Sequence, residues 1–161
     1  EQAGSYTGTI RIGDRTIELG NATGHRDHSW GARDMTAAKS WTWLTVQFEE
    51  GMAVNVASFE AGKLDIMGGY IYRNGRNRAL REIKLETEFE DDGLTQKSLR
   101  FSIEDTGGFR MDVEGRVVNP IPIVVADDDK IRSFAFEAMT EYTWQGRKAY
   151  GISEYVHRVD K

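Results

Sequence analysis

The stretch Glu82-Ile-Lys-Leu-Glu-Thr-Glu-Phe89 decides how the rest of the sequence is interpreted. Its apolar and β-branched residues, Ile83, Leu85, Thr87 and Phe89, alternate strictly with charged residues. Because successive side chains of a β-strand point to opposite faces, this alternation predicts a strand with one face against a core and the other in water. Half-exposed strands of this kind are typical of antiparallel sheets.

Similar strand patterns recur on both sides of that stretch, separated by short turns. A hairpin is predicted over Tyr6–Leu19, and further strands over Trp41–Phe48, Met52–Phe59, Leu64–Arg73, Leu99–Glu104, Phe109–Glu114, Ile131–Trp144 and Lys148–Arg158. Asn119-Pro120-Ile121-Pro122 is expected at an edge or crossover, because proline lacks the N–H that an interior strand donates. The chain therefore has about nine or ten strands and no convincing helix. Such a sheet commonly closes into a barrel or folds into a sandwich.

Composition narrows the class of protein. The chain has 161 residues, a length that predicts one domain over residues 1–161, and a net charge of -5. Its 21 lysines and arginines are scattered, which argues against a nucleic-acid partner, and no apolar run is long enough for a membrane span. The absence of cysteine excludes disulfides and thiolate chemistry. The compartment stays open, with the cytoplasm favoured, and neither a cofactor nor a metal is predicted.

The densest chemistry lies in Gly24-His-Arg-Asp-His-Ser-Trp-Gly-Ala-Arg-Asp34, which follows neither the strand nor the helix period and predicts an irregular loop reaching about Lys39. Here His28 is the candidate general acid or base, Asp27 its orienting carboxylate and Trp30 an apolar wall beside a developing cation. Arg26, Arg33 and Asp34 would support them through ion pairs. Two alternatives are a polar plug that closes one end of a barrel and a metal site built from His25, Asp27 and His28.

Polar and aromatic residues also interrupt the apolar strands. Trp41, Trp43, Asn55 and Tyr70 are candidate ligand contacts facing one lumen, although core packing explains each of them singly. Glu154 lies among apolar neighbours and therefore needs a partner, for which Arg26 or Arg33 is the candidate; a bulge at Gly151 that turns it to solvent is the alternative. Glu154 is thus predicted to anchor the loop. His157 is interpreted as an ordinary surface histidine.

Two segments point to a family. The run from Gly24 to Asp34 and the ending Trp144-Gln-Gly-Arg-Lys-Ala-Tyr-Gly-Ile-Ser-Glu-Tyr155 resemble the C-terminal domain of the AttH-like, carotenoid 1,2-hydratase-like superfamily. That superfamily is built from two lipocalin-like β-barrels in tandem and includes carotenoid hydratases, kievitone hydratase and cyclase-like enzymes. The resemblance implies that residues 1–161 form one antiparallel lipocalin-like β-barrel, the C-terminal half of a two-barrel protein.

The resemblance also implies a chemistry. In the hydratases, a His-x-Trp pair is implicated in proton-assisted addition of water to a C=C bond, and His28 and Trp30 match it. A tyrosine and an aspartate are implied on a following strand, where this sequence offers only Asn55 or Glu60. We therefore expect a barrel that binds a small apolar molecule (isoprenoid, lipid or aromatic) and acts as a cofactor-independent hydratase or lyase. The alternative is a non-catalytic binding or structural barrel. Expected partners are a second lipocalin-like domain or another copy of the chain.

Overall fold

The structure is a computed structural model that describes residues 1–32, 36–48 and 51–161. Ten β-strands and no helix occur among these residues, so the prediction of an all-β chain is confirmed. No described segment is a helix that is long and apolar enough to cross a membrane. The chain forms two compact units, Glu1–Gly31 and Ala32–Lys161, which are described separately below.

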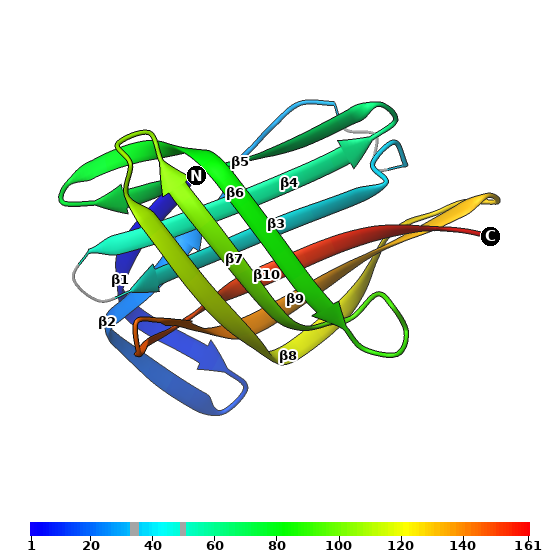
Figure 1. Cartoon of the computed structure of the whole chain (residues 1–161). Coiled ribbons are helices and arrows are strands. Elements are labelled where there is room, and N and C mark those ends of the chain that lie inside the picture. Colours follow the sequence, from blue (N-terminus) through cyan, green and yellow to red (C-terminus); the bar gives the residue numbers. More distant parts are fainter. Residues whose placement is uncertain (33–35, 49–50) are drawn as a thin grey trace. The chain divides into compact units, whose positions relative to one another are not determined.

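The first unit is an antiparallel hairpin of β1 (Gln2–Ile12) and β2 (Arg15–Arg26) (Figure 1). Its tight turn contains Gly13, whose φ of 57° is the left-handed conformation that glycine adopts without strain. The hairpin predicted over Tyr6–Leu19 is therefore confirmed, but the pairing continues until Gln2 meets Arg26. Gly24, His25 and Arg26 thus belong to a strand, and the irregular segment begins only at Asp27.

The second unit is a closed antiparallel barrel of eight strands in the order β10-β3-β4-β5-β6-β7-β8-β9. These strands are β3 (Ser40–Phe48), β4 (Met52–Ala61), β5 (Leu64–Arg73), β6 (Arg76–Phe89), β7 (Gln96–Asp105), β8 (Arg110–Asp127), β9 (Ile131–Trp144) and β10 (Arg147–Asp160). Each strand pairs with the next, and β10 closes the ring by pairing with β3 (Figure 1). The predicted barrel is confirmed; eight of the ten strands make it, and the other two form the separate hairpin.

The prolines lie where their chemistry requires. Pro120 and Pro122 belong to the part of β8 that pairs with β9 alone, because the ladder between β7 and β8 ends at Arg116. On the side of β8 that faced β7, this segment has no neighbouring strand among the described residues, so no carbonyl there lacks the hydrogen bond that a proline cannot donate. The expected edge position of this segment is confirmed.

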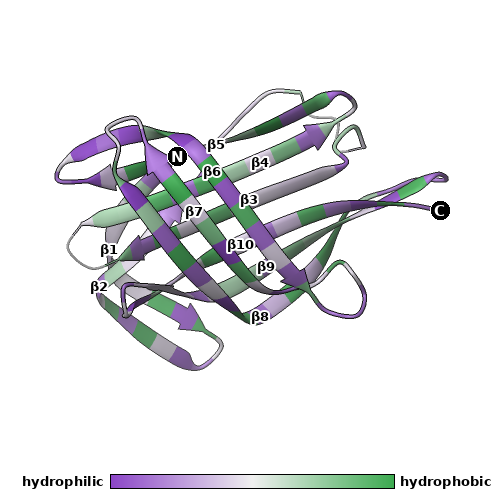
Figure 2. Cartoon of the chain, viewed as in Figure 1, coloured by the Kyte–Doolittle hydropathy of each residue, from purple (hydrophilic) through white to green (hydrophobic). Residues whose placement is uncertain are grey.

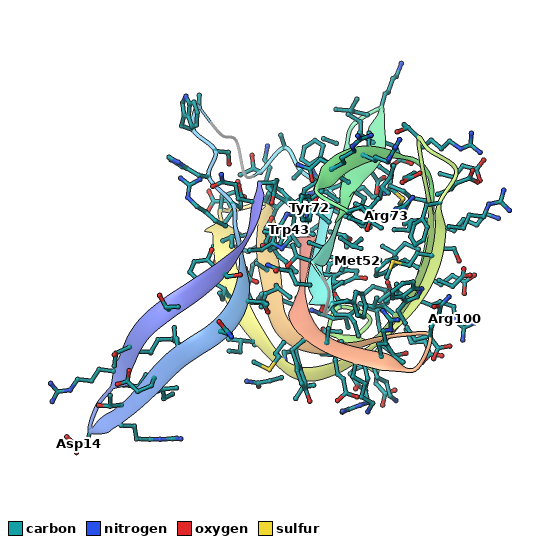
Figure 3. The ribbon with its side chains drawn as sticks, turned by 90° about the vertical axis from the view of Figure 1, so that its left-hand side faces the viewer. Asp14, Trp43, Met52, Tyr72, Arg73 and Arg100 are labelled. Atoms are coloured by element: carbon teal, nitrogen blue, oxygen red, sulfur yellow. The ribbon has the colours of Figure 1, made fainter. Side chains whose placement is uncertain are left out.

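Side chains alternate between the inner and outer faces of the strands, and those on the inner face fill the barrel. Along β6, the charged residues at even positions from Glu82 to Glu88 are exposed, while Ile83, Leu85 and Thr87 are half-buried. Figure 2 shows such alternation as successive hydrophobic and hydrophilic bands along β6, β7 and β8. The inward residues form one cluster, made of Leu44, Val46, Phe48, Val54, Val56, Ile71, Leu99, Phe101, Ile103, Met111, Val113, Tyr142, Trp144 and Tyr155. Figure 3 shows Met52 among the side chains inside the ring and Arg100 on its outside.

Two glycines allow the sheet to bend closely around β3 and β4. A Cβ atom at Gly69 would lie 2.1 Å from the carbonyl oxygen of Asn55, and one at Gly151 would lie 1.9 Å from that of Thr45. Any other residue would force the neighbouring strands apart, so glycine permits the tight approach at which the sheet closes.

Candidate functional site

The end of the hairpin unit holds the His-x-Trp pair. The Nη2 atom of Arg26 lies 2.9 Å from Nδ1 of His28, and the rings of His28 and Trp30 lie 5.3 Å apart at an angle of 56°. A guanidinium has donors only, so Nδ1 accepts this hydrogen bond and the ring proton stands on Nε2. Arg26 therefore selects one tautomer of His28, whose Nε2–H donates to none of the residues that the structure describes.

Arg26 makes the contact that was expected from Asp27. Within the described part of the chain, Asp27 has no hydrogen bond or ion pair, and it is exposed. Residues two apart in an extended chain point the same way, whereas the residue between them points to the opposite side. This explains why Arg26, and not Asp27, reaches His28. Trp30 is 84% exposed, and the predicted supports Arg33 and Asp34 lie outside the described residues.

The four candidate ligand contacts share one face of the barrel, but it is the outer face. Trp41 and Trp43 in β3 point away from the side of Leu44, Val46 and Phe48, which belong to the core. Asn55 pairs with Tyr70 across β4 and β5, next to Thr45 of β3. The expectation that these side chains face the lumen is therefore wrong. Periodicity separates the two faces of a strand, but it does not say which one turns inward when both are apolar.

This outer face, formed by Trp41, Trp43, Asn55 and Tyr70, has both apolar and polar groups. Trp41 packs edge-on against Phe59 with ring centroids 6.3 Å apart. Asn55 is only 4% exposed and donates from Nδ2 to the carbonyl oxygen of Leu44 at 3.4 Å. Between them, Ala57 and Gly68 pair with each other and have the smallest side chains of the face. Large aromatic side chains thus flank the small residues Ala57 and Gly68.

Glu154 extends the same outer face onto β10. It is half-buried, and its direct ladder neighbours are Trp43 in β3 and Glu137 in β9. Its surroundings are therefore mixed, with an aromatic ring on one side and a second carboxylate on the other. Its predicted anchoring of the loop through Arg26 or Arg33 stays a prediction.

The inner face of β10 contains the residue that sequence reasoning missed. His157 is half-buried, its Nε2 is fully buried, and its ring packs against Phe89, Phe136 and Tyr155 at centroid distances of 5.5–6.2 Å. Burial lowers its pKa, although the backbone of Leu94 and the charge of Asp92 act in the opposite direction. The interpretation of His157 as a surface residue is wrong. Its spacing puts it on the same face as Ser153 and Tyr155, but spacing alone does not say that this face turns inward.

Hydrogen bonds cross the barrel near His157. The Tyr155 hydroxyl lies 2.6 Å from Oγ1 of Thr87 in β6. Gln96, at the start of β7, donates from Nε2 to the carbonyl oxygens of Phe136 and Ser153 at 2.9 and 3.0 Å. These bonds link opposite walls of the ring. The interior is thus a packed and cross-braced core, consistent with a barrel of eight strands whose side chains fill it.

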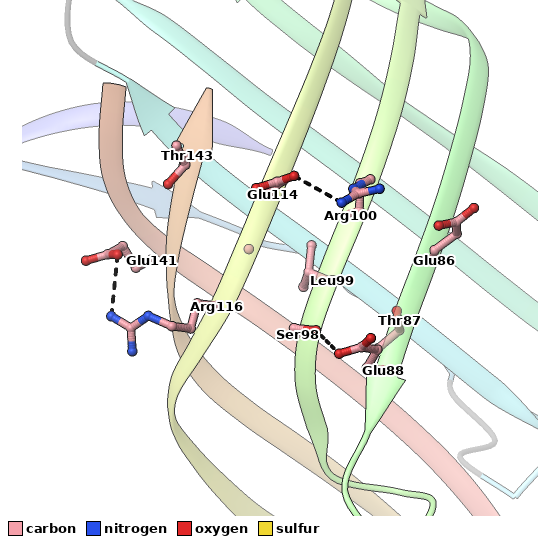
Figure 4. Close-up of a pocket in the computed structure, with 11 residues that line it drawn as sticks. Glu86, Thr87, Glu88, Ser98, Leu99, Arg100, Glu114, Arg116, Glu141 and Thr143 are labelled. Carbon is pink, nitrogen blue, oxygen red and sulfur yellow. Dashed lines mark hydrogen bonds and ion pairs between the residues drawn. The ribbon is translucent and has the colours of Figure 1, made fainter. Parts of the chain in front are cut away.

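Two further possibilities, a metal site and a surface hollow, find less support in the structure. Within residues 1–32, 36–48 and 51–161, no three His, Asp or Glu side chains stand close enough to hold a metal ion. A hollow of about 570 Å³ lies on the outer face of β6 to β9 (Figure 4). Its walls pair with one another, since Arg100 meets Glu114 at 3.1 Å and Arg116 meets Glu141 at 3.4 Å. Because these charged side chains already pair with one another, they offer few unpaired charges to a ligand.

Comparison with known proteins agrees with the fold. No curated protein matches the sequence. Seven chains of solved structures match, among them a protein of Nitrosomonas europaea that bears the provisional name AttH, with a TM-score of 0.51 and 13% sequence identity. The match covers 94% of this chain and 48% of that one, so this chain spans about half the length of the solved structure.

A likeness at this identity concerns the fold alone, and it agrees with the AttH-like, lipocalin-like barrel described above. A family model, described as a domain of unknown function, DUF7064, matches residues 1–159. Since this match takes in almost the whole sequence, the chain belongs to the DUF7064 family.

Proposed function

We propose that the chain binds a small, largely apolar molecule on the outer face of β3, β4 and β5. One observation supports this most: Trp41, Trp43, Asn55 and Tyr70 occupy neighbouring positions of three adjacent strands. Aromatic rings provide broad apolar contact, and the polar tips of the two tryptophans and of Tyr70 can orient a ligand, while the buried Asn55 braces the strand beneath them. The filled interior supports an outer site over a lumenal one. The ligand class is an isoprenoid, lipid or aromatic compound.

Ligand titration tests this proposal. Geraniol, dodecanoate and 2-naphthol represent the three classes, and binding is followed by tryptophan fluorescence and by calorimetry. We expect Trp43→Ala and Tyr70→Ala each to weaken binding of the preferred compound by about tenfold, the effect of losing one well-packed aromatic contact. Tyr150, which is 58% exposed on β10, supplies the matched control Tyr150→Ala. Binding that survives Trp43→Ala and Tyr70→Ala unchanged would contradict the proposal.

Acid–base hydration or lyase chemistry at His28 is the second candidate. The contact between His28 and Trp30, with Nδ1 held by Arg26, favours it because the remaining Nε2–H has a defined direction. To protonate a C=C bond, an imidazolium would first require Nδ1 to release Arg26 and take up a proton. The alternative is that this segment has a structural role only.

The variant His28→Ala separates these two possibilities. If His28 is a general acid or base, the variant loses water addition to an isoprenoid alkene while its melting temperature stays unchanged. If the segment is structural, the melting temperature falls whether or not turnover is detected.

We further propose that the barrel acts beside a second lipocalin-like domain or a second copy of itself. The coverage of 48% of the AttH chain supports this, because that chain has room for a second domain of similar size. Sedimentation over a range of protein concentrations distinguishes the two partners. A concentration-dependent dimer favours a second copy, whereas a monomer at all concentrations favours a different domain.

A further inference from the structure

A group of arginines gathers at the end of the barrel where β5 turns into β6. Arg73, Asn74, Arg76 and Arg78 line a hollow of about 320 Å³ around this turn. Asn74 and Gly75 both adopt positive φ, 51° and 72°, as a tight hairpin requires. Because Arg73 and Arg76 are direct ladder partners and Arg78 is two residues further along β6, the turn brings three guanidinium groups to one place.

A buried carboxylate holds two of these arginines. Asp105, at the end of β7, is 1% exposed; its Oδ1 accepts hydrogen bonds from the backbone N–H groups of Gly107 and Phe109 at 2.7 and 2.9 Å. Its Oδ2 lies 3.7 Å from Nε of Arg73 and 4.0 Å from Nε of Arg78, and it accepts no hydrogen bond from any described residue. Asp105 therefore orients both arginines without occupying their hydrogen-bond donors.

Asp105 stays charged in this position. Burial acts to raise its pKa, but the N–H groups of Phe109 and Gly107, together with Arg73 and Arg78, outweigh it and lower the pKa. The local charge is then three arginines against one carboxylate, an excess of two positive charges in a chain whose net charge is -5.

The surroundings leave the guanidinium groups of Arg73 and Arg78 without hydrogen-bond partners among the described residues, although Nε of Arg73 is itself buried. The guanidinium of Arg73 lies 4.1 Å from the centre of the Phe109 ring, and Nη1 of Arg78 lies close enough to Gly107 that a Cβ there would stand 2.7 Å from it. Stacking on a ring and packing against glycine both fix a guanidinium plane without using its N–H groups. Among the described residues, Arg76 has neither a hydrogen bond nor an ion pair.

We propose that Arg73, Arg76 and Arg78 form a binding site for a phosphate group. Forked guanidinium donors match the geometry of phosphate oxygens, and a phosphate monoester bears about -1.5 to -2 charges near neutral pH. This charge balances the local excess of two, whereas a single carboxylate would leave half of it uncompensated. The site is independent of the outer aromatic face, since it lies at the β5–β6 turn and uses none of its residues.

Calorimetry with inorganic phosphate on the full chain, in buffers matched with chloride to constant ionic strength, tests the site. We expect saturable binding of one phosphate that Arg76→Gln weakens by about tenfold, the loss of one charge-assisted contact. Arg76→Gln should leave the melting temperature unchanged because Arg76 has no hydrogen bond or ion pair to lose in the described part of the chain. Arg78→Lys, which keeps the charge but removes the planar fork, should also weaken binding.

The control is Arg100→Gln, which removes the same charge from an exposed position of β7 that pairs with Glu114 outside the hollow. Equal weakening in Arg100→Gln and Arg76→Gln would overturn the proposal, as would binding of acetate as tight as that of phosphate, or no phosphate binding above the chloride background. Co-sedimentation with phosphatidylcholine vesicles, with and without phosphatidic acid, identifies the source of the phosphate. Arg76-dependent binding to the acidic vesicles points to a lipid headgroup, and phosphate binding without it points to a phosphorylated small molecule.

Discussion

Tyr155 and His157, on the inner face of β10, hold uncharged rings inside the barrel and make its stability depend on pH. Their positions differ in one respect. The Tyr155 hydroxyl has a partner in Thr87, whereas Nε2 of His157 is buried and unpartnered among the described residues. Burial opposes ionisation of these side chains in the folded state but not in the unfolded state. Each side chain therefore makes the free energy of unfolding depend on pH within its own range of pH.

Tyr155 governs the alkaline side. Burial raises its pKa to about 12, although the hydrogen bond with Thr87 acts in the opposite direction. An unfolded tyrosine loses its proton near pH 10, so between about pH 10 and 12 the unfolded state binds fewer protons and the free energy of unfolding falls as pH rises.

We therefore expect Tyr155→Phe to make this alkaline loss smaller and, at neutral pH, to lower the free energy of unfolding by about 1–2 kcal/mol, because the Thr87 hydroxyl loses its partner. Urea denaturation at several values of pH measures both effects. Tyr142, whose pKa burial also raises, remains as background in the variant. An unchanged alkaline slope would contradict the role given to Tyr155.

His157 governs the acidic side. Its pKa is lowered by burial, so below about pH 6.5 the unfolded chain binds a proton that the folded chain resists, and stability falls as pH falls. His157→Gln should reduce the loss of stability between about pH 7 and 5. Part of the loss should persist in the variant, because burial also lowers the pKa of His25. Urea denaturation at the two values of pH measures this difference. Equal losses in the variant and the parent would show that His157 does not titrate on unfolding.

At the scale of the element, the closeness of neighbouring strands depends on single glycines. Gly68 and Gly69 are adjacent in β5, yet a Cβ at Gly69 would lie 2.1 Å from the Asn55 carbonyl oxygen, whereas one at Gly68 would meet nothing within 4 Å. The φ of Gly69 is also 155°, a conformation that other residues rarely adopt. Only one of the two positions therefore requires glycine.

The pair of variants Gly69→Ala and Gly68→Ala isolates that requirement. We expect Gly69→Ala to lower the free energy of unfolding by about 2–4 kcal/mol, because β4 and β5 must separate. Gly68→Ala should change it by less than about 0.5 kcal/mol, as for a surface substitution. Thermal denaturation of both proteins provides the comparison. Similar melting temperatures for the two would show that β4 and β5 do not need the close approach.

Glu154 links three strands through its neighbours Trp43 and Glu137. Because it is half-buried, we expect Glu154→Ala to lower the free energy of unfolding by about 2 kcal/mol, through loss of the contacts of its carboxylate. Glu154→Gln, which keeps the size and part of the hydrogen bonding, should cost less. A melting temperature unchanged in Glu154→Ala would exclude an anchoring role.

At the scale of the whole molecule, closure of the ring depends on β10. It pairs with β9, which precedes it in the chain, and with β3, where Gly151 meets Val46 far away in the sequence. Within the closed part of the ring every strand has a partner on both sides, and removal of one strand would expose two edges.

We expect a chain that ends at Trp144, and so lacks β10, to lose its cooperative thermal transition and to aggregate, because β3 and β9 become open edges. Calorimetry and light scattering measure the two effects. A chain that lacks β10 and still melts cooperatively as a monomer would show that the other strands form a stable sheet without closure.

The sequence by itself determined the local structure. Strict alternation at Glu82–Phe89, the hairpin turns at Gly13 and Asn74-Gly75, and the prolines at 120 and 122 indicated strands, turns and an edge without reference to the rest of the chain. These features depend on backbone conformation and on the difference between the two faces of one strand. The His28–Trp30 pair was found in the same way, because its members are close in sequence.

Only the tertiary structure decided which faces turn inward and which distant residues meet. β3 and β10 have apolar side chains on both faces, so Trp41 and Trp43 could be assigned to the outside, and His157 to the inside, only after the ring had closed. Likewise, Arg73, Arg78 and Asp105 come from three different strands, and nothing in their spacing predicts that they meet. The physical reason is that closure buries one face of every strand at once, a choice made by the packing of the whole barrel.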